Sequence, residues 1–92
     1  MPTKFTRTNF GTSAYVALDA TINGSATVTF ANGTGVICRF AGEADSAPAI
    51  GTTSYCAVAS NSGAVFSIVC NPARTWIATG TGGGTLEMTI SY

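Results

Sequence analysis

Residues 25–30 read SATVTF and residues 85–91 read TLEMTIS, so apolar and polar side chains alternate in both segments. In the first segment Ala26, Val28 and Phe30 fall on one side, and two threonines fall on the other. A period of two is typical of a β-strand with one face on a core and one face in water. Both segments therefore predict strands of an antiparallel sheet.

Turn signals separate further short β-branched segments along the rest of the chain. Asn23-Gly24 and Asn32-Gly33 favour hairpins, because asparagine and glycine tolerate positive φ. No stretch combines a helical period with caps. About seven strands are predicted, at residues 14–18, 25–30, 35–40, 54–59, 64–70, 74–79 and 85–91. This spacing suits a sandwich, a jelly roll or a small barrel, and we expect an all-β, antiparallel β-sandwich of jelly-roll type without significant helix.

The chain of 92 residues is expected to form one domain. Residues 13–92 are predicted to form the sandwich. Residues 1–12 are predicted to be either an edge strand of the same sheet or an extended arm laid across a partner. No apolar segment follows the first cations as in a signal peptide, which predicts synthesis and folding in the cytoplasm of the cell that makes the chain.

The composition argues against several classes of function. Charged residues make up 9% of the chain, the net charge is zero and histidine is absent, so the usual base of nucleophilic catalysis is missing. The few scattered cations do not form a nucleic-acid footprint. No basic amphipathic helix is available for a membrane surface, and the apolar runs are too short to span one. We predict a protein that is not an enzyme, uses no cofactor, and binds neither nucleic acid nor a membrane.

Cys38, Cys56 and Cys70 each lie in an apolar, strand-like segment. An odd number of cysteines without a secretory signal argues against a disulfide framework. No metal site is predicted, since neither histidine nor a Cys-x-x-Cys spacing accompanies them. We expect small buried side chains, with a single Cys38–Cys70 bridge left open.

Several predicted strands are apolar on both faces, which a monomeric two-layer sandwich does not require. The clearest is segment 64–70, AVFSIVC, which also lacks charge and proline and would promote association if exposed at an edge. We expect it in a sheet interior or at an interface with a second chain. In the N-terminal arm, phenylalanines would anchor to a partner and cations would pair with its acids. The candidate interface residues are Lys4, Phe5, Arg7, Phe10, Ile37, Phe66, Val69 and Trp76.

Two alternatives remain open at this point. Trp76 with Tyr15, Tyr55 and Tyr92 could form a sugar-stacking platform, as in a glycan- or receptor-binding module. The threonine content is also compatible with an ice-binding or adhesive β protein, although the threonines follow no regular repeat.

Three features carry a resemblance to known proteins: FTRTNF at 5–10, the two Asn-Gly dipeptides, and RTWIATG at 74–80 leading through glycines into LEMTI at 86–90. In these the chain resembles the small, threonine- and glycine-rich β proteins of tailed-bacteriophage virions. The resemblance implies a capsid decoration (cement) protein, or a tail, head-fibre or connector component. It further implies a homodimer or homotrimer seated on a major capsid protein at the virion surface.

Overall fold

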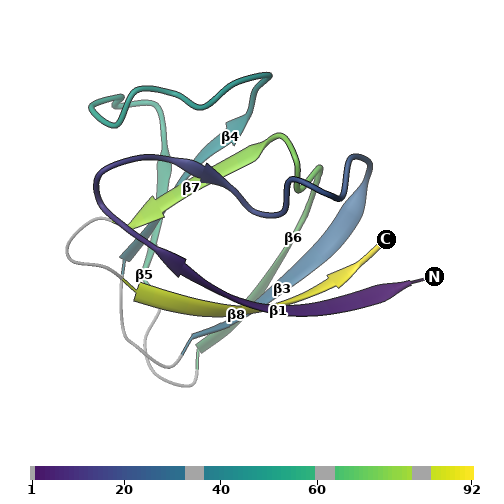
Figure 1. Ribbon diagram of the computed structural model, residues 1–92. Helices are drawn as coiled ribbons and strands as arrows, with labels where there is room; N and C mark the ends of the chain where they lie inside the picture. Colours follow the sequence, from purple (N-terminus) through teal and green to yellow (C-terminus); the bar gives the residue numbers. More distant parts are fainter. Residues whose placement is uncertain (1, 33–36, 60–63, 80–83) are drawn as a thin grey trace.

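The computed structural model describes residues 2–32, 37–59, 64–79 and 84–92 (Figure 1). Within the strands, some side chains also lie outside the described part, those of the predicted interface residues Phe10, Ile37 and Phe66 among them. The predicted Asn32-Gly33 turn lies outside it as well.

Eight strands and no helix occur in these described ranges. The strands are β1 (Thr3–Phe10), β2 (Val16–Ala17), β3 (Ala26–Asn32), β4 (Ile37–Glu43), β5 (Cys56–Ala59), β6 (Ala64–Cys70), β7 (Thr75–Thr79) and β8 (Gly84–Ser91). They form two antiparallel sheets, the first in the order β1-β8-β3-β6 and the second in the order β2-β7-β4-β5 (Figure 1). The predicted all-β sandwich is confirmed.

The strands pair in a nested order: β4 with β5, β3 with β6, β2 with β7 and β1 with β8. Nested pairing makes one long antiparallel hairpin, which additional pairing of β3 with β8 and of β4 with β7 rolls into two sheets. This connectivity is that of a jelly roll. It brings the chain ends together, and the Tyr92 N–H donates to the Pro2 carbonyl oxygen at 3.0 Å (Figure 1).

The core lies between the sheets and is formed by the inward faces of the alternating segments. Val28 and Phe30 of β3 are fully buried, and so are Cys38 and Ile77 from the second sheet. The rings of Phe30 and Phe40 meet edge to face, with centroids 5.4 Å apart and planes at 71°. This contact joins the two sheets.

The N-terminal segment is part of the first sheet. β1 pairs with β8 along its whole length, from Thr3 opposite Ser91 to Phe10 opposite Gly84. Residues 3–10 are therefore an edge strand of the chain's own sheet. None of the described segments forms a helix with the length and apolar character that crossing a bilayer requires.

Candidate interaction surface

The outer face of the first sheet carries hydroxyl groups in its middle and apolar side chains at its two edges. The strand register sets three rows across it: Thr3, Ser91, Thr27 and Val69; Phe5, Thr89, Thr29 and Ser67; and Arg7, Glu87 and, on β6, Val65. At the β1 edge Phe5 is 78% exposed, and at the β6 edge Val65 and Val69 are 65% and 74% exposed. The exposed apolar area of this face is thus concentrated at its edges.

β6 combines exposed apolar side chains with an edge that pairs with no other strand in the described fold. In the described fold it pairs with β3 alone, from Ala26 opposite Cys70 to Asn32 opposite Ala64. Edge strands are commonly protected by charges, proline, bulges or shortness, and the seven residues of β6 include no charged residue and no proline. Of the two places expected for segment 64–70, the sheet interior is wrong, because β6 lies at an edge.

An apolar cavity of about 350 Å³ opens between β6 and the second sheet. Ile68 and Cys70 line it from β6, and Phe40, Glu43 and Cys56 line it from β4 and β5. β5 and β6 are both edge strands, so the two sheets leave a gap on this side of the sandwich. The β6 edge and this cavity together form a continuous apolar region, which we call the β6 side.

The three cysteines occupy different environments, and all are free. Cys38 is buried as expected, whereas Cys70 is half-buried and Cys56 is exposed, because Cys56 begins the edge strand β5 and faces the open cavity. The bridge left open between Cys38 and Cys70 is not formed. Burial raises the pKa of both the Cys38 and the Cys70 thiol, and the nearby Glu43 carboxylate adds to the effect at Cys70 while a hydrogen bond with Thr75 opposes it. Among the described residues, no group of three potential ligands could hold a metal ion.

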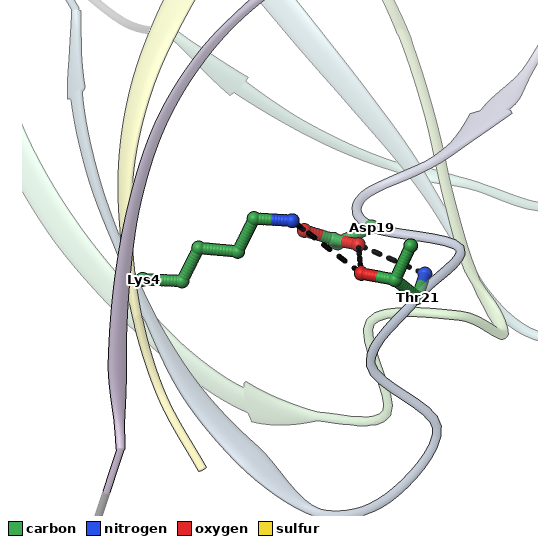
Figure 2. A network of polar contacts seen from close by, with 3 residues as sticks. All are labelled: Lys4, Asp19 and Thr21. Carbon is green, nitrogen blue, oxygen red and sulfur yellow. Dashed lines mark hydrogen bonds and ion pairs between the residues drawn. The ribbon is translucent and has the colours of Figure 1, made fainter.

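The opposite side of the sandwich is closed by a polar cluster (Figure 2). Lys4 of β1 lies opposite the buried Ile90, so its side chain points inward, and its Nζ lies 2.6 Å from Oδ2 of Asp19, just after β2. Asp19 Oδ1 accepts hydrogen bonds from the backbone N–H and the hydroxyl of Thr21, at 2.9 and 2.5 Å. The cluster therefore ties an edge of the first sheet to an edge of the second.

The Asp19 carboxylate has only 8% of its side chain exposed, against 41% for Lys4. Burial by itself raises the pKa of Asp19, but the hydrogen bonds from Lys4 and Thr21 and the charge of Lys4 outweigh it. The net effect holds the pKa of this carboxyl below its ordinary value. Asp19 is therefore ionised in the folded chain at neutral pH.

The two cations predicted to meet a partner both contact acids of their own chain. Lys4 binds Asp19, and Arg7 forms an exposed ion pair with Glu87 on the neighbouring strand β8. Phe5, between them, is the most exposed large apolar side chain described. The interface role of Lys4, Phe5 and Arg7 stays a prediction.

The aromatic residues considered for sugar stacking differ in burial and in their partners. Tyr15 is buried, and Tyr92 follows β8 in the first sheet. Trp76 is half-buried in β7, and its Nε1–H donates to the Ala44 carbonyl oxygen at 3.0 Å. The guanidinium group of Arg39 lies over the ring of Tyr55, 4.8 Å from the ring centroid. These contacts give no support to the glycan-binding alternative.

Val69 is among the interface residues predicted from the sequence, and Val65, exposed on the same strand, is not. The period of two could have found it, because residues 65, 67 and 69 share one face of β6. Cys56 was likewise expected in the interior, since nothing in its neighbours distinguishes an edge strand from a central one.

No protein-family model and no curated protein matches the chain. One solved structure similar to it belongs to work described as "Bacillus endospore appendages form a novel family of disulfide-linked pili". The TM-score is 0.49 and the sequence identity 18%, over 99% of this chain and 84% of that chain.

Proposed function

We propose that the chain is a non-enzymatic structural subunit that acts by self-association, and that it serves as a capsid decoration protein of a bacteriophage virion. The observation that carries the proposal is the outer edge of β6, which pairs with no strand in the described fold. β6 has seven residues without charge, and its Val65 and Val69 are largely exposed. A lone soluble domain rarely leaves such an edge uncovered, because it is a template for pairing with another chain.

The state of the charged side chains supports a non-catalytic role. Every one of the eight has a partner within the chain, whereas acid–base catalysis needs groups directed at a substrate. The ion pairs are Lys4–Asp19, Arg7–Glu87 and Arg74–Asp45, the Glu43 carboxylate accepts from the Asn71 N–H at 2.9 Å, and Arg39 lies over the ring of Tyr55.

A rigid jelly roll with an adhesive edge suits a decoration protein. Such a subunit needs no reaction: occupation of many equivalent sites on a shell stabilises the assembled lattice by mass action. A tail, head-fibre or connector component would use the same surface, so the choice of the capsid among these rests on the resemblance to phage virion proteins.

Self-association is tested by analytical ultracentrifugation of the purified chain at micromolar concentration. We expect a dimer or a trimer. Val65→Thr combined with Val69→Thr keeps the shape and β-propensity of both side chains but makes them polar, so it should weaken association. Thr27→Val is the matched control, because it makes the reverse exchange on the same face but on an interior strand. A wild-type chain that sediments as a monomer contradicts the proposal.

The virion assignment has its own tests. A major capsid gene beside the gene for this chain supports it, and the purified chain should then co-sediment with empty shells of that capsid protein. A chain that self-associates but does not bind those shells contradicts the decoration role while leaving the structural role intact.

A further inference from the structure

β6 differs from the other three sheet edges of the described fold in how it is protected. β2 has two residues and β5 has four, too short to add a long strand. β1 is long, but it carries the inward-facing Lys4 and the Arg7–Glu87 pair. β6 alone combines a length of seven residues with an uncharged edge. Strand addition to this fold is therefore favoured at β6.

We propose that β6 pairs antiparallel with β6 of a second copy of the chain, about a two-fold axis that passes through Ser67 perpendicular to the first sheet. The proposal rests on the proposed self-association and specifies its contact. In this register Val65 lies opposite Val69 of the second copy and Ser67 opposite its own counterpart. The two first sheets would join into one sheet of eight strands.

The sequence of β6 is nearly symmetric about Ser67, which favours a second copy of the chain as its partner. Read from Ser67 outward, AVFSIVC pairs a large apolar residue with a large one, valine with valine, and a small residue with a small one. An isologous interface requires such a strand, because each residue i meets a residue j and j meets i. Cross-strand contact of valines at the outer face covers Val65 and Val69, whose side chains are largely exposed.

The alternation of side chains selects both the direction and the centre of the pairing. A two-fold axis perpendicular to the sheet makes the strands antiparallel and keeps outer face beside outer face. A two-fold axis between two residues would pair outward-facing residues of one strand with inward-facing residues of the other. An axis at residue 67 pairs residue 65 with residue 69 of the second copy, and both face outward. Only this centre brings all seven residues of both strands into register.

Charge complementarity disfavours the competing head-to-tail contact between β6 and β1 of a neighbour. β1 brings Lys4 and Arg7, which already pair with Asp19 and Glu87, and β6 has no charged residue with which to contact these ion pairs. The β6–β6 contact brings no charge to either side. We therefore expect the two-fold contact.

The experiment compares two double variants by sedimentation equilibrium alongside the wild type. In the proposed register Val65→Lys with Val69→Lys places two pairs of like charges opposite each other. Val65→Lys with Val69→Glu places two pairs of opposite charges there. Both variants change the same solvent-facing positions, so circular dichroism should show the same fold. The dimer of the variant with two lysines should have a dissociation constant more than tenfold higher than the dimer of the variant with lysine and glutamate. Added salt should reduce this difference between the two dissociation constants.

The outcomes separate this pairing from self-association itself. Equal dimerisation of the two variants, or equal loss of it, overturns the β6–β6 register, while a dimeric wild type still supports the structural role. A monomeric wild type overturns both proposals.

A crosslinking measurement keeps the test independent of charge. Ser67→Cys, in a background with Cys56→Ser and Cys70→Ser, should form dimers with a short bismaleimide, because opposite Cβ atoms lie about 4.5–5.5 Å apart. Thr27→Cys is the control on the same face: two copies of residue 27 would lie roughly 20 Å apart at the usual strand spacings. Failure of the residue-67 variant to crosslink in a dimeric sample overturns the register.

Discussion

Asp19→Asn should lower the free energy of unfolding, because it removes the charge that ties the two sheets together on the β1 side. A hydrogen bond to a charged group contributes about 1.5–3 kcal/mol. Asparagine keeps an acceptor for Thr21, so the loss falls on the 2.6 Å contact with Lys4 Nζ. Lys4 is 41% exposed, and water therefore replaces part of that contact. We expect a loss near the lower end of the range, about 1.5–2 kcal/mol at neutral pH.

The pH dependence gives this prediction a second test. The pKa of Asp19 in the folded chain lies below its ordinary value of 3.8, so the stability it contributes is fully present above that value. It is lost as the pH falls through the folded pKa, because the carboxyl of the wild type is then protonated. The difference between wild type and Asp19→Asn should stay constant from neutral to mildly acidic pH and vanish in strong acid.

Urea denaturation at fixed protein concentration measures both effects, with Trp76 as the only tryptophan. Glu87→Gln is the matched control, because its ion pair with Arg7 is exposed on both sides, and it should change stability by less than about 1 kcal/mol. Equal effects of the two substitutions, or an Asp19→Asn effect that does not depend on pH, would refute the reasoning.

Three further predictions concern the core, the bulge and the thiols. Phe30→Ala should cost about 3–5 kcal/mol in a denaturation experiment, since it empties a fully buried site at the centre of the core. Gly42→Ala should cost about 1–2 kcal/mol in the same assay. Gly42 has a φ of 87° at the bulge of β4, and a Cβ there meets no other atom within 4 Å, so the cost is one of backbone conformation. In thiol labelling followed by mass spectrometry, Cys56 should react first, Cys70 more slowly because burial raises its pKa, and Cys38 only on unfolding.

The sequence predicted the strands well where a local signal exists. The alternation in 25–30 and 85–91 identified Val28, Phe30, Met88 and Ile90 as inward, and all four are buried. The segment at 14–18 was predicted too long, since only Val16–Ala17 forms β2. Beyond the segment, Asp19 accepts the Thr21 N–H in a turn.

What the sequence could not supply depends on long-range pairing. The polar and apolar residues of 3–10 fit a free arm as well as an edge strand. Pairing with β8 makes this segment an edge strand, and β8 is distant in sequence: Arg7 and Glu87, which are in contact, lie 80 residues apart. The same holds for 64–70: the pattern predicts its two faces, but not that its second edge is open. The sequence could therefore predict which side chains belong to the candidate surface, but not where their strands lie in the sheet.

The difference between the two sides of the sandwich bears on what kind of assembly can form. If β6 pairs with a second β6, the joined eight-stranded sheet has β1 at each end. There the inward Lys4 and the Arg7–Glu87 pair discourage another strand from adding. The apolar edge would be consumed in the first contact, and growth would stop at two subunits. A closed unit of this kind can occupy many equivalent sites on a shell without polymerising in solution, which is the behaviour that a decoration protein needs.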